Sequence, residues 1–236
     1  MTELLRLEKV ESSYGASQVL FGISLEVGVG EVVTLLGRNG MGKTTTIRSI
    51  MGIMNPHAGE IYFKGQRIDG QPSFKVGQAG LGLVPEGRQI FPNLSVYENL
   101  IATAANRVDS PDPWTVEKIL SLFPPLADRQ SNAGNQLSGG EQQMLAISRA
   151  LMTNPDLLIL DEATEGLAPL VRDDIWKVLE QLKKAGQSIL IIDKNVDVLT
   201  RIADKHYIIE KGVVVWDGSS DKLKKDQDLQ QRYLGV

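Results

Sequence analysis

The chain contains no cysteine, which excludes disulfides and any zinc or iron–sulfur site ligated by cysteine. It has no apolar run near the roughly 18–20 residues that cross a membrane. Its first residues, Met1–Arg6, lack the basic start, long apolar core and small-residue cleavage site of a signal peptide. We therefore expect a cytoplasmic protein. Basic residues are in deficit too, and the formal net charge of −4 disfavours nucleic acid as a partner.

A glycine-rich segment, Gly37–Thr44, follows the apolar run Glu31–Leu36 and precedes the helix-like run Thr45–Met51. Its pattern, G-x-x-x-x-G-K-[ST] between a strand and a helix, is typical of a phosphate-binding loop rather than a chance glycine-rich turn. Glycines let backbone N–H groups face an anion, and the helix that opens at Lys43 points its positive end the same way. Lys43 would reach the β- and γ-phosphates, and the Thr44 hydroxyl would bind magnesium. The predicted nucleotide-binding residues of this segment are Gly37, Arg38, Asn39, Gly40, Gly42, Lys43, Thr44 and Thr45.

Two acidic residues end another apolar strand pattern. The run Leu157–Leu160 is followed by Asp161 and Glu162. Ligands bind at the carboxyl ends of parallel strands, so these carboxylates are candidates for chemistry, the alternative being a pair of exposed turn acids. Asp161 would hold magnesium, and Glu162 would accept a proton from an attacking water as general base. Together with the glycine-rich loop, they predict phosphoryl transfer.

A third segment, Leu137–Gln142, places two glycines at the start of a predicted helix. Ser138 would cap this helix, and Glu141 three residues later would complete a capping box. The exposed N–H groups of Gly139 and Gly140 also favour an anion at the positive end of the helix. The chain thus carries two predicted phosphate-facing surfaces.

The order of patterns along the chain predicts its organisation. Of 236 residues, 42% are hydrophobic and 23% are charged, which fits a globular protein with a full core. Strand and helix patterns alternate, which predicts an α/β fold with a mainly parallel sheet and helices on both faces. We expect a single domain, residues 1–236, in which 1–85 and 153–236 form the nucleotide-binding core and 86–152 form an inserted helical subdomain.

Three local expectations can be compared directly with the structure. Residues 4–10 are predicted to form a strand, followed by a turn over 11–15. Pro124 and Pro125 are expected to end a helix over 114–122.

The three motifs together resemble those of the ATP-binding subunits of ABC transporters. Gly37–Thr44 is similar to their Walker A motif, Leu157–Glu162 to Walker B, and Leu137–Gln142 to the signature motif. The resemblance covers essentially the whole chain. It implies a P-loop NTPase (RecA-like) core with a mainly parallel sheet, a small antiparallel β subdomain and the inserted helical subdomain. It also implies an ATPase that uses ATP and Mg²⁺ and is coupled to transmembrane transport.

The resemblance accounts for the two phosphate-facing surfaces. In this family two nucleotide-binding domains enclose two ATP molecules, and the signature motif of one contacts the γ-phosphate held by Walker A of the other. The signature residues implied to act in trans are Leu137, Ser138, Gly139, Gly140, Glu141 and Gln142. Tyr14 matches the aromatic residue that stacks on adenine, the alternative being a packed turn tyrosine.

A closer resemblance is to the ATP-binding subunits of branched-chain amino-acid importers. It rests on Val84–Arg88 followed by Ile90–Pro92, on Leu137–Ala150 and on Gly166–Pro169. It implies a second ATP-binding subunit in a homo- or heterodimer, two transmembrane permease subunits docked near Glu86–Asn99, and an external substrate-binding protein. The chain would then lie peripherally on the cytoplasmic face of the inner or plasma membrane. The alternatives are another ABC transporter, such as a urea or amide importer or an exporter, and a nucleotide-gated clamp with weak hydrolysis.

The sequence departs from the family pattern at three places. Glu86 stands where most members have a glutamine that contacts magnesium or the attacking water, so it is a candidate metal-binding residue. Lys194 stands where most members have a switch histidine, and its ammonium cannot accept a hydrogen bond as imidazole can. Ala163–Glu165, which leads into the D-loop Glu165–Ala168, stands where the branched-chain subgroup commonly has Pro-Ser-Leu. We expect Lys194 either to contact the γ-phosphate and slow hydrolysis or to be a solvated lysine.

Overall fold

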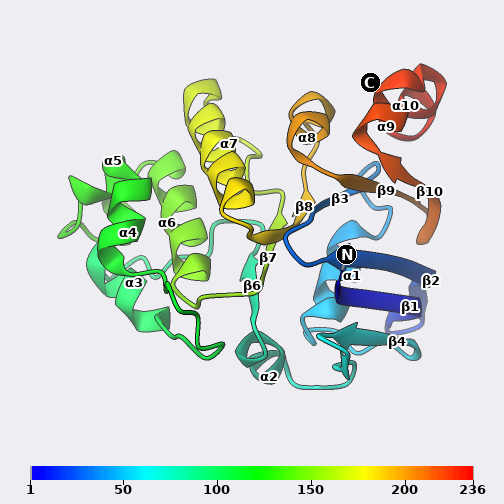
Figure 1. Cartoon of the computed structure of the whole chain (residues 1–236), viewed down its shortest axis with the longest axis horizontal. Helices are drawn as coiled ribbons and strands as arrows, with labels where there is room; N and C mark the ends of the chain where they lie inside the picture. Colours follow the sequence, from blue (N-terminus) through cyan, green and yellow to red (C-terminus); the bar gives the residue numbers. More distant parts are fainter. Residues whose placement is uncertain (1, 236) are drawn as a thin grey trace.

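A six-stranded sheet crosses the protein in the strand order β10-β9-β3-β8-β7-β6 (Figure 1). The computed structural model describes residues 2–235. Neighbouring strands from β9 to β6 are parallel, and β10 pairs antiparallel with β9, which confirms the predicted mainly parallel sheet. The strands are β3 (Val32–Leu36), β6 (Leu81–Val84), β7 (Leu157–Asp161), β8 (Ser188–Ile192), β9 (Lys205–Glu210) and β10 (Val213–Ser219).

The central strands are buried on both faces and divide their side chains between two cores. Along β8, Ile189 and Ile191 face one core, whereas Leu190 and Ile192 face the other, because successive side chains of a strand point to opposite faces. The second core includes residues of α1 (Lys43–Ile50) and of a smaller sheet. The first core is completed by α6 (Gly139–Leu151), α7 (Pro169–Lys184) and α8 (Val196–Ile202).

The smaller sheet is antiparallel, with the strand order β2-β1-β4-β5. The expected turn over 11–15 is wrong, because β1 continues to Tyr14 and pairs it with Ser17. Hydrogen bonds to the neighbouring strand, which local sequence does not report, extend the strand through these polar residues. The strands are β1 (Glu3–Tyr14), β2 (Ser17–Gly28), β4 (Ala58–Phe63) and β5 (Gln66–Arg67), and α2 (Ser73–Gln78), which the sequence patterns did not predict, follows them.

A group of helices between β6 and β7 in the chain forms one end of the molecule, at the left of Figure 1. Pro124 and Pro125 do not simply end a helix, because they open the next one. Proline fits the first turn, where its missing N–H would have no partner within the helix. The helices are α3 (Val96–Thr103), α4 (Val116–Leu122), α5 (Pro124–Ala127), the 3₁₀ turn η1 (Gly134–Gln136) and α6.

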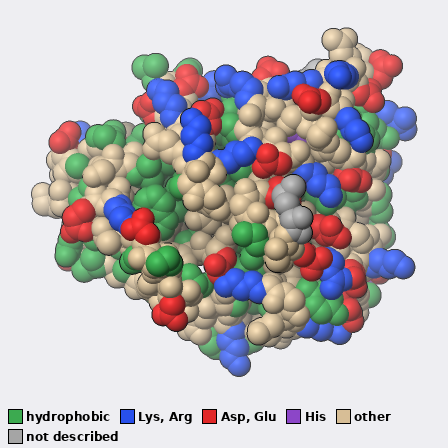
Figure 2. All heavy atoms as spheres, viewed as in Figure 1, with side chains coloured by type: hydrophobic (Ala, Val, Ile, Leu, Met, Phe, Trp, Pro, Cys, Tyr) green, Lys and Arg blue, Asp and Glu red, His purple; other side chains and the backbone are tan. Residues whose placement is uncertain are grey.

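Two short helices, α9 (Ser220–Lys225) and α10 (Gln227–Tyr233), close the described chain at the opposite end of the molecule (Figure 1). Within residues 2–235, none of the helices combines the length and the apolar character needed to cross a bilayer. Figure 2 shows acidic and basic side chains interspersed on the face of the molecule that it displays.

Candidate functional site

The glycine-rich loop connects the end of β3 to the start of α1. Three of its glycines, Gly37, Gly40 and Gly42, have positive φ angles of 142°, 78° and 109°. A Cβ atom on Gly37 would lie 2.3 Å from the carbonyl oxygen of Ile209 on β9. The backbone of β9 therefore leaves no room for a side chain at Gly37. Without one, the loop passes close to the sheet and its N–H groups can face an anion.

Lys43 lies across this loop. Its Nζ donates hydrogen bonds to the carbonyl oxygens of Gly37, at 2.8 Å, and Arg38, at 3.0 Å. Burial lowers the pKa of Lys43, and the negative charge of Glu162 opposes this effect. A partly desolvated ammonium at a helix N-terminus favours an anionic ligand, because a phosphate would restore the interactions that burial has removed.

Thr44 joins the loop to the end of β7. Its hydroxyl donates to Oδ1 of Asp161 at 3.3 Å. Burial raises the pKa of Asp161, and the hydrogen bond from Thr44 opposes that effect, whereas the nearby charge of Glu86 adds to it. Within residues 2–235 no group of three or more His, Cys, Asp or Glu side chains is arranged to hold a metal. A hydroxyl and a carboxylate nevertheless fit Mg²⁺, which takes one or two protein oxygens and completes its shell with phosphates and water.

Glu162 follows Asp161 in a left-handed backbone conformation, with φ of 52°. Its N–H donates to the carbonyl oxygen of Ile192 at 2.9 Å, which ties the end of β7 to the end of β8. A hydrogen bond between the carboxyl groups of Glu162 and Glu165, together with burial and the charge of Glu165, raises the pKa of Glu162 to about 7. A carboxyl group that titrates near neutral pH suits a general base.

Lys194 donates through Nζ to Oε1 of Glu165. The sequence predicted that Lys194 either contacts the γ-phosphate or is solvated. It did not predict the ion pair with Glu165. The available signal was the acidic residue at 165, which is part of a departure from the branched-chain resemblance. Glu162, Glu165 and Lys194 line one cavity of about 330 Å³ at the carboxyl ends of β7 and β8.

A second contact joins the same two loops within the lining of this cavity. The Thr164 hydroxyl donates to Oδ2 of Asp193 at 2.5 Å. The N–H of Asn195 donates to Oδ1 of Asp193 at 3.0 Å. Both Thr164 and Asp193 are buried. The backbone on either side of Glu165 and Lys194 is therefore fixed, although the two side chains themselves are exposed.

Tyr14 lies at the end of the β1–β2 hairpin and is 44% exposed. Its hydroxyl accepts a hydrogen bond from Nη1 of Arg48 on α1, at 3.2 Å. The ring is therefore held by the helix that starts at the phosphate loop, and an exposed aromatic face so placed can stack on a base.

The signature segment forms the N-terminus of α6, and the predicted capping box is confirmed. The Glu141 N–H donates to Oγ of Ser138 at 3.3 Å, and the Ser138 N–H donates to Oε2 of Glu141 at 2.7 Å. A Cβ on Gly139 would lie 2.5 Å from Nη1 of Arg88, a neighbour the sequence did not reveal. Figure 1 shows α6 and α1 on opposite sides of β6 and β7, so this chain does not bring its signature segment to its own phosphate loop.

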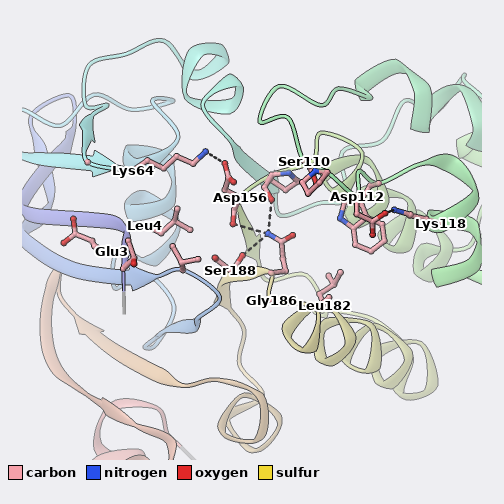
Figure 3. A pocket seen from close by; sticks show the side chains of 18 residues that line it. Glu3, Leu4, Lys64, Ser110, Asp112, Lys118, Asp156, Leu182, Gly186 and Ser188 are labelled. Atoms are coloured by element: carbon pink, nitrogen blue, oxygen red, sulfur yellow. Dashed lines mark hydrogen bonds and ion pairs between the residues drawn. The ribbon is translucent and has the colours of Figure 1, made fainter.

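A cavity of about 900 Å³ lies at the other edge of the sheet, where β7 and β8 begin (Figure 3). Four of its charged side chains form the ion pairs Lys64–Asp156 and Lys118–Asp112, and Glu3 pairs with Arg6. Gln187 donates to the carbonyl oxygens of Pro155 and Asp156, at 3.0 and 3.2 Å. The polar groups here bind one another rather than converging on a ligand. The phosphate loop and its carboxylates remain the better candidate site, in keeping with ligand binding at carboxyl ends of strands.

Both the sequence and the fold have known relatives. Residues 20–165 match the family model described as ABC transporter. The chain is 38% identical to the high-affinity branched-chain amino acid transport ATP-binding protein BraG of Pseudomonas aeruginosa, over 98% of this chain and 100% of that protein. It is 34% identical to the lipopolysaccharide export system ATP-binding protein LptB of Haemophilus influenzae, over 98% and 97%. The solved ADP conformation of MJ1267, an ATP-binding cassette of an ABC transporter, superposes on this chain with a TM-score of 0.84 at 27% identity. The match covers 100% of this chain and 98% of the MJ1267 chain.

Proposed function

This chain belongs to the ABC transporter family, and from that premise we propose that it powers an importer of branched-chain or related amino acids. The ATP-binding cassettes of this family hydrolyse ATP, so the chain is an ATPase coupled to transmembrane transport. The observation that carries the assignment of the site is the contact between Thr44 and Asp161. It joins the phosphate loop to a strand end that carries the carboxylates needed for phosphoryl transfer.

In the proposed site, the loop from Gly37 to Thr44 binds the phosphates of ATP through its N–H groups and through Lys43. Thr44 and Asp161 would hold Mg²⁺, which supplies charge neutralisation at the phosphates. Glu86 lies close enough to add its negative charge at Asp161 and is proposed to contribute through water. Tyr14 stacks on the adenine ring.

Glu162 is the proposed general base. A water oxygen bonds to the γ-phosphorus, its proton passes to a carboxylate oxygen of Glu162, and the bond to the β-phosphate oxygen breaks to release ADP and phosphate. Glu162→Gln removes the proton acceptor and keeps the shape, so we expect hydrolysis to fall about 10²–10⁴-fold while ATP still binds. Glu180→Gln on α7 is the matched control. Hydrolysis that survives Glu162→Gln contradicts this role.

The signature segment is proposed to act on ATP bound by a partner subunit. Gly139 and Gly140 are half-buried at the N-terminus of α6, next to its Ser138 cap, where the positive end of the helix favours a γ-phosphate. The separation of α6 from α1 supports action in trans rather than within one chain. We therefore propose a dimer with a second ATP-binding subunit, identical or not, that closes on ATP and opens after hydrolysis.

The membrane subunits are proposed to dock in a groove of about 530 Å³ between α2, α3 and α6. Phe74 on α2 lines the groove and is 61% exposed, and the exposed side chains of Phe91 and of Tyr97 and Ile101 on α3 lie outside its lining. Arg149 of α6 braces the groove, because its guanidinium lies 4.1 Å from the Phe91 ring centre and donates to the Gln89 carbonyl at 2.6 Å. Hydrophobic side chains also gather on the helical end in Figure 2. Such a groove fits a short amphipathic helix of a permease, which would hold the chain at the cytoplasmic face of the membrane.

Substrate class is tested in the assembled transporter. We would copurify the chain with its permeases and add the external binding protein loaded with leucine, isoleucine or valine. Stimulated ATP hydrolysis is the expected result. Stimulation by urea or an amide instead, or by lipopolysaccharide as the LptB relative would suggest, would move the assignment to that transporter class. ATP binding with negligible turnover in every assembly would favour the nucleotide-gated clamp.

A further inference from the structure

Glu162, Glu165 and Lys194 form a connected set of side chains at the edge of the proposed ATPase site. Glu165 is the central member, because its carboxylate accepts from Lys194 and its N–H donates to the carbonyl oxygen of Glu162 at 3.2 Å. The three side chains line the same cavity. Lys194 contacts Glu165 directly, whereas its charge acts on the proposed base from farther away and more weakly than Glu165 does.

The two loops that carry these side chains are joined to each other at the sheet and by a buried hydrogen bond. β7 and β8 are neighbours in the sheet, with Asp161 opposite Ile192, so the loops that follow them start side by side. The buried bond from Thr164 to Asp193 then fixes these loops together. The pairing of the two loops therefore places Lys194 next to Glu165.

The charges of the three side chains depend on one another. Two carboxyl groups in contact repel each other when both are ionised, and Lys194 compensates the charge on Glu165. The pair is about half exposed, with side-chain exposures of 49% for Lys194 and 47% for Glu165, so it contributes little to folding. An exposed pair with little structural value, in contact with a proposed base, is best explained by an effect on that base.

We propose that Glu165 and Lys194 are positioning residues for ATP hydrolysis, in which Lys194 fixes Glu165 and Glu165 holds the carboxyl group of Glu162 toward the attacking water. This inference rests on the proposed role of Glu162. In this proposal, Lys194 and Glu165 together take the role that a single side chain has at the switch position. Lys194 acts on the base through Glu165 and not by contacting the γ-phosphate.

A double-mutant cycle separates these two roles of Lys194. We would measure kcat and KM for ATP in the full chain, with the subunits that copurify with it, for Glu165→Gln, Lys194→Gln and the double variant. Each single change should lower kcat roughly 10-fold with KM nearly unchanged, because a misplaced catalytic group costs rate rather than binding. The double variant should be little slower than Glu165→Gln, since the hydrogen-bonded contact of Lys194 in this set is with Glu165. Lys194→Arg keeps a cation for Glu165 and should retain most activity.

The control is Lys177→Gln, which breaks a comparable exposed ion pair with Asp174 on α7, away from the site. It should leave kcat unchanged. Two results would overturn the inference: single variants with wild-type kcat, or a double variant whose loss is the product of the single losses, as for a lysine that contacts the phosphate directly. If Glu162→Gln itself has no effect, it is the proposed function that fails and not the positioning role alone.

Discussion

His206 gives the protein an acid-sensitive point within the sheet that carries the phosphate loop. It lies on β9 and is completely buried. Nδ1 lies 2.6 Å from the hydroxyl of Thr34 on β3, and Nε2 lies 2.8 Å from Oγ of Ser220. Because Ser220 donates its own hydrogen to the carbonyl oxygen of Ala203, it must accept from Nε2–H. Nδ1 is then the acceptor of the Thr34 hydroxyl, so the hydrogen bonds fit the neutral ring.

Burial lowers the pKa of His206 to about 4, partly opposed by the charge of Asp204 and assisted by that of Lys224. The unfolded chain, with an ordinary histidine pKa near 6.5, binds the proton more readily than the folded protein. Stability from this residue is therefore fully present above about pH 6.5 and is lost as the pH falls toward about 4. The loss amounts to about 2 kcal/mol between about pH 7 and about pH 5.

The assay is urea unfolding at these two pH values for the wild type and for His206→Gln. The variant is less stable at both values, but it lacks the titrating ring, so its stability should fall by about 2 kcal/mol less than that of the wild type on acidification. Comparing the two proteins removes the contributions of other groups. Glu162 titrates in the same range with the opposite sign, because its raised pKa favours the folded state at acidic pH. An equal fall in both proteins would refute the reasoning.

Two further predictions concern the phosphate loop and its neighbour. Gly37→Ala should destabilise the protein by about 2–4 kcal/mol in urea unfolding, because the new Cβ would lie 2.3 Å from the Ile209 carbonyl oxygen. Gly77→Ala, where a Cβ meets no atom within 4 Å, should be nearly neutral, and equal losses would contradict this explanation. Tyr14→Ala should weaken ATP binding by about 1–3 kcal/mol in calorimetry, whereas Tyr14→Phe should not, because stacking needs the ring and not the hydroxyl. Similar affinities for all three proteins would exclude stacking.

The local sequence determined the features whose partners lie within a few residues of one another. The capping box of Ser138 and Glu141 spans three positions, and the spacing of glycines in Gly37–Thr44 needs only the strand before it and the helix after it. The apolar run Leu157–Leu160 likewise predicted a strand that ends at the acidic residues, and β7 spans Leu157–Asp161. These features were predicted because the interactions that form them are short-range.

The tertiary structure decided the contacts between distant segments. Lys194 meets Glu165 across 29 residues, and His206 meets Thr34 across 172, because neighbouring strands bring them together. The extension of β1 to Tyr14 has the same cause, since pairing with β2 supplies the hydrogen bonds. Strand order is set by how helices and sheets bury their apolar faces, which no local pattern encodes. The motifs of this ATPase can therefore be identified from its sequence alone. The residues around its proposed base are brought together by the pairing of β7 with β8 in the sheet.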